Sequence, residues 1–159
     1  MERDERRVEC TTCGFVHYAN SVPAVSALVV DDERGLLLAR RAAEPDAGKW
    51  DTPGGFLEEG EEPIDALRRE LLEETGLSVA VGHFVGMFSD RYGNGPAAPA
   101  VLNLVWEVTI AGGEPRAADD VSELRWFASD ALPDKRELAF RWLGPCLRDW
   151  ALRDHPRTH

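Results

Sequence analysis

Three glutamates on one predicted helix face constrain this chain more than any other feature of its sequence. Residues 63–75 predict a helix, because proline opens the segment, apolar side chains recur at helical spacing and a glycine follows it. Glu70, Glu73 and Glu74 are spaced i, i+3, i+4, so their carboxylates project to one side. Like charges at this spacing repel. Either the face is solvated, or a hard cation such as Mg²⁺ or Mn²⁺ offsets the charge through oxygen ligands.

The residues before and after this acidic face follow a longer pattern. Pro53-Gly54-Gly55 precedes the helix and allows close backbone approach, so the carbonyl of Gly54 is a further candidate oxygen ligand. From Gly55 to Leu77 the chain reads glycine, five residues, glutamate, seven residues, then Arg-Glu-Leu-Leu-Glu-Glu-Thr-Gly-Leu. This pattern resembles the signature of the Nudix hydrolases at every defined position. Looser similarity extends over residues 36–41, 50–56 and 124–127.

The resemblance implies an α/β fold, an α/β/α sandwich with a mixed central sheet. It also implies one to three Mg²⁺ or Mn²⁺ ions and hydrolysis of a nucleoside diphosphate linked to another group. By position, the implied metal ligands are the three helix glutamates and Gly54, with Glu70 as either ligand or water-activating base. Arg69 is expected to orient a carboxylate. Glu61 is either a ligand through water or a residue of the helix start.

A further catalytic acid is expected from a loop opposite the helix. Asp120 is the first candidate, and Asp119 and Glu123 are alternatives, although Asp119-Asp120 also reads as a simple polar turn. Arg41, or Arg40 beside it, is a candidate for holding a substrate phosphate, because phosphates recur as arginine partners. Either arginine could equally be surface charge at the end of a strand.

The predicted loop 89–100 is long enough to be functional and offers Tyr92 for stacking on a base. Phe56, Tyr18 and Phe88 are lesser candidates that packing alone would also explain. This loop, together with these aromatic residues, suggests a pocket for a base or ribose.

Two cysteines near the N-terminus suggest a metal knuckle. Cys10-x2-Cys13 is followed by glycine, and a closed zinc site would need two further ligands, such as His17 and Cys146. The alternatives are a knuckle without metal and a Cys146 that is a small buried hydrophobe. The segment resembles the second half of the zinc ribbon of NADH pyrophosphatases, but the first C-x-x-C is missing.

Two substrate markers of related enzymes are also missing. The S-Q-P-W-P-F-P-x-S segment of NADH pyrophosphatases is replaced by residues 87–94, and Tyr92 and Gly93 stand where a subgroup of ADP-ribose pyrophosphatases has proline. The working hypothesis is still ADP-ribose or a dinucleotide ahead of a nucleoside triphosphate, and the sequence does not name one compound. A nucleotide-binding module without catalysis is the rival interpretation, but such modules lose helix carboxylates that this chain keeps.

Length and charge indicate one domain and a small-molecule substrate. The 159 residues divide into a knuckle-like segment at 1–20, a Nudix domain at 21–153 and a fraying tail at 154–159. No apolar run is long enough to cross a membrane, so a cytoplasmic protein is expected. The net charge of −11 argues against nucleic acid as a partner. A homodimer is possible if Trp142 and Leu143 form an exposed apolar patch rather than part of the core.

Apolar patterning predicts the remaining elements. Strands are expected at 22–30, 36–40, 77–88, 101–110 and 124–127, and a second helix from 145.

Overall fold

A computed structural model of the chain describes residues 7–153. Its elements are β1 (Arg7–Glu9), β2 (Val16–Tyr18), β3 (Val22–Asp31), β4 (Gly35–Arg41), β5 (Trp50–Asp51), β6 (Gly54–Phe56), α1 (Pro63–Thr75), β7 (Ser78–Arg91), β8 (Ala100–Gly112), β9 (Val121–Phe127), the 3₁₀ turn η1 (Lys135–Glu137) and α2 (Leu143–Leu152).

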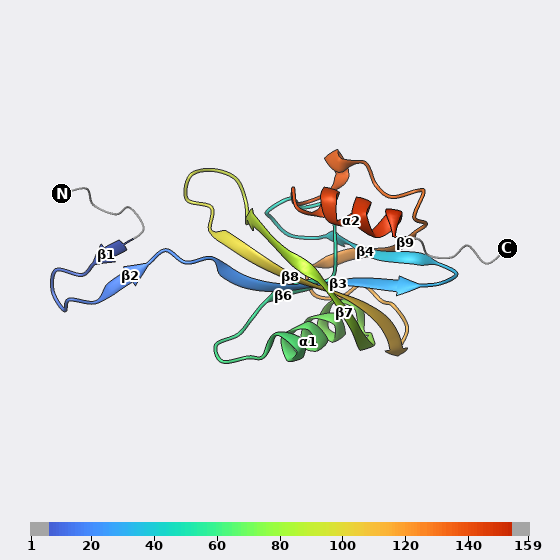
Figure 1. The fold of residues 1–159 in the computed structure, drawn as a ribbon, viewed down its shortest axis with the longest axis horizontal. Helices are drawn as coiled ribbons and strands as arrows, with labels where there is room; N and C mark the ends of the chain where they lie inside the picture. The colour runs from blue at the N-terminus through green and yellow to red at the C-terminus, as the bar shows by residue number, and fades with distance from the viewer. Residues whose placement is uncertain (1–6, 154–159) are drawn as a thin grey trace.

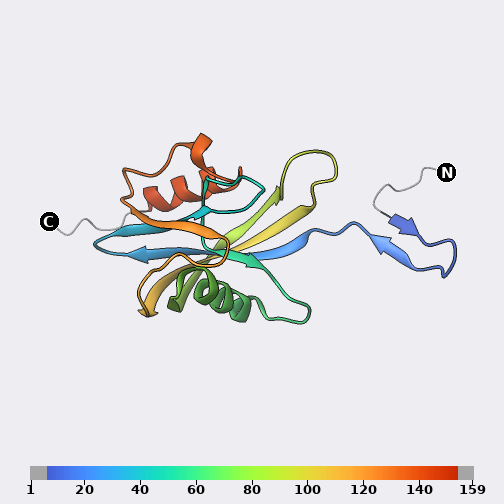
Figure 2. The same cartoon turned by 180° about the vertical axis from the view of Figure 1, so that it is seen from behind.

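A mixed sheet lies between the two helices, as expected from the resemblance (Figures 1 and 2). The strand order is β5-β4-β3-β8-β7, with β6 paired to β3 and β9 paired to β4. Strands β3 and β8 are parallel, and the other pairings in this sheet are antiparallel. Helix α1 covers one face of the sheet and α2 covers the other, which gives the α/β/α sandwich.

Alternating side chains of the central strands fill a separate core on each face. In β3, Leu28 packs on the α2 side, and its neighbours Ala27 and Val29 pack on the α1 side. In β4, Leu36 and Leu38 face α2, whereas Leu37 faces α1. This period of two explains why the apolar runs at 22–30 and 36–40 lack the alternation of a half-exposed strand.

Several predicted boundaries were wrong by two or three residues, the end of β8 and the start of β9 among them. Strand β7 continues three residues past Phe88, because its ladder with β8 extends to the pair Arg91↔Ala100, so the loop is shorter than predicted. Helix α2 begins at Leu143, two residues before the predicted start. Trp142 and Leu143 are buried, with 5% and 0% of their surface exposed, so they belong to the core rather than to a surface patch.

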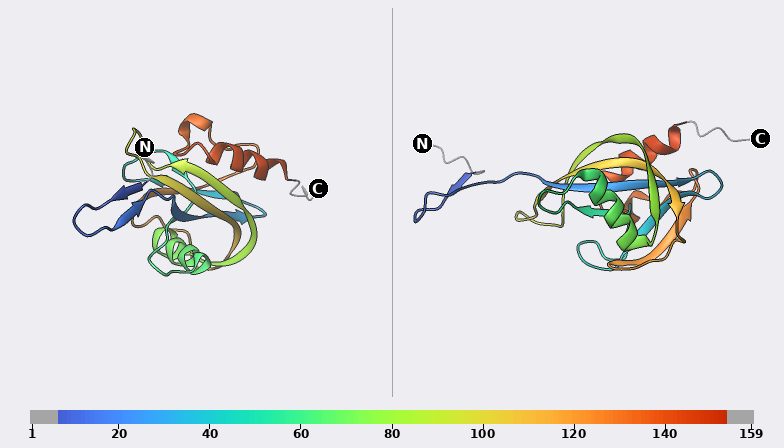
Figure 3. Two further views of the ribbon diagram at one scale, coloured as in Figure 1. Left: turned by 60° about the vertical axis from the view of Figure 1, so that its left-hand side comes forward. Right: turned by 90° about the horizontal axis from the view of Figure 1, so that it is seen from below.

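The N-terminal strands form a separate hairpin. Strands β1 and β2 pair only with each other and stand away from the main sheet (Figure 3). Cys10 and Cys13 are exposed at its turn, whereas Cys146 is buried in the α2 core, where burial raises the pKa of its thiol to about 11. Cys146 is therefore not available to complete a knuckle site.

The rest of the N-terminal prediction gains no support. Within residues 7–153, no three cysteine, histidine or carboxylate side chains gather as a metal-binding group, so no third ligand lies beside Cys10 and Cys13. The predicted fraying of 154–159 lies outside the described residues. Among the helices in the described part of the chain, none has the length and apolar character needed to span a membrane.

Candidate active site

A pocket of about 330 Å³ opens beside the C-terminal half of α1, where the ends of several strands meet. Strands β3 and β6, helix α1, the end of β7 and the loop before β9 all contribute to its wall. Most predicted site residues line it, namely Arg41, Gly54, Phe56, Arg69, Glu70, Glu74, Tyr92 and Asp120.

Glu74 is the most deeply buried carboxylate of the pocket. Only 7% of the residue is exposed, and its Oε2 accepts a hydrogen bond from the backbone N–H of Gly54 at 2.9 Å. Burial raises the pKa of Glu74 to about 9, and the negative charges of Asp120, Asp51 and Glu70 add to this shift. The fold therefore holds a carboxylate where ionisation is costly unless a cation lies beside it.

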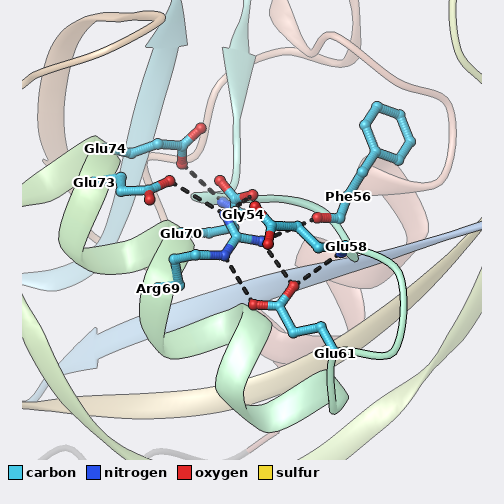
Figure 4. A network of polar contacts seen from close by, with 8 residues as sticks. All are labelled: Gly54, Phe56, Glu58, Glu61, Arg69, Glu70, Glu73 and Glu74. Carbon is cyan, nitrogen blue, oxygen red and sulfur yellow. Dashed lines mark hydrogen bonds and ion pairs between the residues drawn. The ribbon is translucent and has the colours of Figure 1, made fainter.

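Arg69 joins the acidic side chains on the outer side of the pocket (Figure 4). Its Nε and Nη2 donate to the two oxygens of Glu61 at 2.8 and 2.9 Å, and its Nη1 donates to Glu70 at 2.8 Å and to Glu73 at 3.2 Å. Nη2 also donates to the carbonyl oxygen of Phe56 at 3.2 Å. One guanidinium thus contacts three carboxylates and the end of β6.

Glu61 contacts both Arg69 and the loop that precedes α1. It forms the two-pronged ion pair with Arg69, and it also accepts from the backbone N–H of Glu58 at 2.9 Å. The hydrogen bonds from Arg69 hold the pKa of Glu61 down, at about 2. Its carboxylate therefore braces Arg69 and the loop before α1. A sequence pattern could not show this pair, because eight residues separate its members.

The three helix glutamates do not share one environment. Glu70 lies in the pocket wall, where burial raises the pKa of its carboxyl against the opposing effect of Arg69. Half of the Glu73 side chain is exposed, and Glu73 is not one of the residues that line the pocket. Gly55 explains the approach of Glu70 to β6, since a Cβ at this position would collide with the Glu70 carboxylate.

Asp120 and Asp51 extend the acidic wall on the side opposite α1. Both line the pocket, and the charge of Asp120 raises the pKa of Glu70, Glu74 and Asp51. Burial is the largest cause of the raised pKa of Asp51, at about 6. Of the alternatives to Asp120, Glu123 instead pairs with Arg40 at 3.3 Å and with Arg125. Asp119 occupies a left-handed turn conformation with φ 54°.

This donor set fits a hard divalent cation. Glu70, Glu74 and Asp120 bring carboxylate oxygens to one hollow, and within residues 7–153 the only ion-pair partner of this group is Arg69, which reaches Glu70 alone among the three. Carboxylates and carbonyls are the ligands that Mg²⁺ and Mn²⁺ prefer. Within residues 7–153, however, no three of these carboxylates lie close enough together to hold one metal ion.

The opposite wall of the pocket is aromatic and is organised by Arg41. Its guanidinium donates to the Tyr92 hydroxyl at 2.9 Å, to Asp51 at 3.2 Å and to the carbonyl of Pro45 at 2.7 Å. It also lies over the rings of Tyr92 and Phe140, which stack on each other with centroids 5.7 Å apart. Arg41 is thus held by three neighbours, and its role in holding a substrate phosphate stays a prediction.

Several pocket residues were missed by the sequence reasoning. They are Asp51, Thr52, Arg91, Asn103, Phe140 and Trp142. Thr52 is notable because its hydroxyl is buried with no hydrogen-bond partner among the described residues. Asp51 and Thr52 belong to the Trp-Asp-Thr-Pro-Gly-Gly run, which was the one available signal for them. The other four residues come from distant segments.

Two of the three lesser aromatic candidates lie outside the pocket. Tyr18 is exposed on the hairpin, and Phe88 packs against the α2 core and stacks on Trp142 at 5.4 Å. Arg40 lies over the ring of Trp50. Phe56 does reach the pocket, with its ring edge-on to Tyr92 at 5.1 Å.

Comparison with known proteins places most of the chain in one family. Residues 20–149 match the family model described as NUDIX domain. An ADP-ribose pyrophosphatase of Methanocaldococcus jannaschii is 36% identical over 125 residues, which cover 77% of this chain and 69% of that protein. A putative 8-oxo-dGTP diphosphatase 2 of Mycobacterium tuberculosis is 42% identical over 125 residues, covering 77% and 80%. A NUDIX hydrolase structure from Nitrosomonas europaea has a TM-score of 0.76 and 25% identity, covering 91% of this chain and 78% of its own.

Proposed function

The chain belongs to the Nudix family of pyrophosphohydrolases, and from this membership we propose that it hydrolyses the diphosphate linkage of a nucleoside diphosphate derivative with Mg²⁺ or Mn²⁺. The single observation that carries the proposal is the pocket that combines three carboxylates, Glu70, Glu74 and Asp120, with an aromatic wall. One side suits a metal-bound diphosphate, and the other suits a base or sugar.

The proposed ligands of the metal are Glu70, Glu73 and Glu74, with the carbonyl of Gly54 and with Asp120 on the opposite side. When bound, the metal would neutralise the diphosphate and lower the pKa of the attacking water. The raised pKa of Glu74 supports this assignment, because a divalent cation would relieve the cost of its buried charge.

The protein's own side chains divide the remaining tasks. Glu70 is the proposed proton acceptor for the attacking water. The alternative is that both of its carboxylate oxygens bind the metal. Arg69 positions Glu70 and Glu73, and Glu61 positions Arg69. Addition of water at one phosphorus breaks one P–O anhydride bond, and the leaving phosphate takes up the charge, so two phosphate monoesters result from a substrate such as ADP-ribose.

The nucleotide part of the substrate is assigned to Tyr92, Phe56 and Phe140. Tyr92 and Phe56 present ring edges and faces to the pocket, and Arg41 fixes Tyr92 through its hydroxyl. ADP-ribose or a dinucleotide is favoured over a nucleoside triphosphate, which agrees with the named activity of the relative from M. jannaschii. The relative from M. tuberculosis makes 8-oxo-dGTP the second candidate.

A substrate panel tests the proposal. ADP-ribose, a dinucleotide pyrophosphate, a nucleoside triphosphate and 8-oxo-dGTP are incubated with the protein and Mg²⁺, and the products are identified by mass. We expect phosphate monoesters from ADP-ribose or the dinucleotide. Release of pyrophosphate from a triphosphate, with no reaction of ADP-ribose, would reverse the order of substrates. Full turnover by both Glu73→Gln and Glu74→Gln would remove the metal mechanism, and no turnover of any compound would leave a binding module.

A further inference from the structure

The active-site pocket contains two buried polar side chains to which the proposed function gives no task. Ser26 on β3 and Asn103 on β8 both line the pocket, and only 6% and 8% of their surface is exposed. Leu28 and Val105, two residues further along the same strands, pack towards α2. Because side chains two residues apart in a strand share a face, Ser26 and Asn103 lie on the α2 face of the sheet. We call this surface the polar floor.

The edge strand fixes the orientation of the Asn103 amide. Its Nδ2 donates to the carbonyl oxygen of Phe88 on β7 at 3.2 Å. Because a carbonyl oxygen can only accept, the amide nitrogen rather than the amide oxygen must face β7. The oxygen Oδ1 and the second N–H of the amide have no hydrogen-bond partner among residues 7–153. Asn103 therefore offers one acceptor beside one donor in a buried position, where leaving such groups unpaired is costly.

Strand β3 separates this amide from the acidic end of the pocket. Ala24 pairs with Asn103 on one side and with Phe56 on the other. Two residues further along β3, Ser26 pairs with Gly54, the proposed carbonyl ligand of the metal. A strand rises about 3.3 Å per residue, so these two ends of the polar floor lie about 7 Å apart along β3. The amide thus lies beside the aromatic wall, away from the proposed metal ligands.

We propose that Asn103 recognises the base of the substrate and selects adenine. Its Oδ1 accepts from the N6 amino group, and its second Nδ2 N–H donates to N7, which is the two-point contact that asparagine makes with adenine. Guanine presents only the acceptors N7 and O6 on the same edge, so Oδ1 would be left unpaired. The inference rests on the proposed function, which it narrows to an adenine nucleotide, and it makes Asn103 the residue that determines the base.

Binding of AMP tests the inference without turnover, because AMP contains no diphosphate linkage. Calorimetric titration of the full chain in Mg²⁺ compares AMP with 7-deaza-AMP, which lacks the N7 acceptor, and with IMP, which lacks the N6 amino donor. We expect the parent to bind each analogue about tenfold more weakly than AMP. Equal Kd values for the three compounds, or no binding of AMP, would overturn the inference. Tighter binding of 8-oxo-dGMP than of AMP would overturn the assignment to adenine.

A variant then ties the preference to one side chain. Asn103→Leu keeps a side chain of similar size without donor or acceptor, and it should bind the three compounds with Kd values within about twofold of one another. The matched control Asn20→Leu changes an exposed asparagine outside the pocket and should keep the preference of the parent. A preference for AMP that persists in Asn103→Leu, or that is lost in the control, would overturn the inference. The comparison in the parent needs no variant, so it decides even if Asn103→Leu does not fold.

Hydrolysis separates this inference from the proposed function. ADP-ribose is compared with the same compound carrying hypoxanthine in place of adenine. We expect kcat/KM in the parent to be about tenfold higher for ADP-ribose, with the difference in KM, and we expect Asn103→Leu to lose this preference. Equal kcat/KM values in the parent would overturn the inference alone. No turnover of either compound would overturn the proposed function alone, because the AMP titration still decides whether Asn103 recognises adenine.

Discussion

Between the sheet and α2 the protein buries tryptophan side chains together with leucines, whereas between the sheet and α1 it buries leucine, valine and alanine side chains next to a carboxylate. Trp142, Leu143 and Trp150 belong to the first core, and Val25, Ala27 and Ala66 belong to the second. Glu74 lies at the edge of the second core with its charge almost removed from water. Helix α2 therefore serves stability, whereas α1 carries the cost of a buried carboxylate at the proposed metal site.

Replacing the buried carboxylate should separate activity from stability most strongly. In Glu74→Gln, the amide oxygen can still accept from Gly54, but the proposed metal ligand and its charge are lost. We expect kcat to fall by about a hundredfold or more, the scale for losing a group that acts on the reacting water. The melting temperature in EDTA should rise, because folding no longer carries the cost of protonating or burying this carboxylate. Steady-state kinetics and calorimetry measure the two effects, and unchanged kcat would contradict the role of α1.

The opposite outcome is expected on the α2 side. Leu143 is fully buried, so Leu143→Ala removes packed side-chain volume and should lower the free energy of unfolding by about 2–5 kcal/mol. The kcat of the folded fraction should stay the same, because Leu143 does not line the active-site pocket. Urea denaturation followed by tryptophan fluorescence gives the first value, and kinetics at low temperature gives the second. A large loss of kcat in fully folded protein would show that the two faces are not independent.

A smaller effect is expected from the brace behind the helix glutamates. Glu61→Gln breaks the ion pair with Arg69 and loosens the hold of Arg69 on Glu70 and Glu73. Residues that orient metal ligands typically change affinity or activity by about 10–100-fold. We expect kcat/KM to fall within that range and to recover in part at high Mg²⁺. A matched exposed change, Glu114→Gln, should have no effect. A loss that high Mg²⁺ does not reduce would mean that Glu61 acts by another route.

The sequence predicted α1 and its acidic face well because both depend on local spacing. Pro63, the apolar stripe and Gly76 set the bounds of α1, and the structure shows the same bounds. It also predicted that Asp120 would face the helix, although 46 residues separate it from Glu74. It could not show that Arg41 is held by Asp51 and Tyr92, or that Phe140 stacks on Tyr92, since these contacts join segments with no common period.

The weakest and most general test of the comparison is the pH dependence of stability without metal. The pKa of Glu74 is about 9 in the folded protein, against an ordinary value of 4.5. Between these values the unfolded chain has lost the proton that the folded chain still binds, so the free energy of unfolding falls as pH rises, by at most about 1.4 kcal/mol per pH unit. Asp51 and Glu70 act in the same direction, because burial raises the pKa of each.

Melting temperatures in EDTA from pH 5 to 8 should therefore decline, and Glu74→Gln should decline less steeply than the parent. Mg²⁺ should restore stability most at pH 8, where fewer protons compete with it for these carboxylates. The variant Leu143→Ala should keep the slope of the parent at a lower overall stability, because the α2 core holds none of these carboxylates. Equal slopes in the parent and Glu74→Gln would show that Glu74 is already ionised in the metal-free fold. The cost assigned to the α1 face would then have to come from elsewhere.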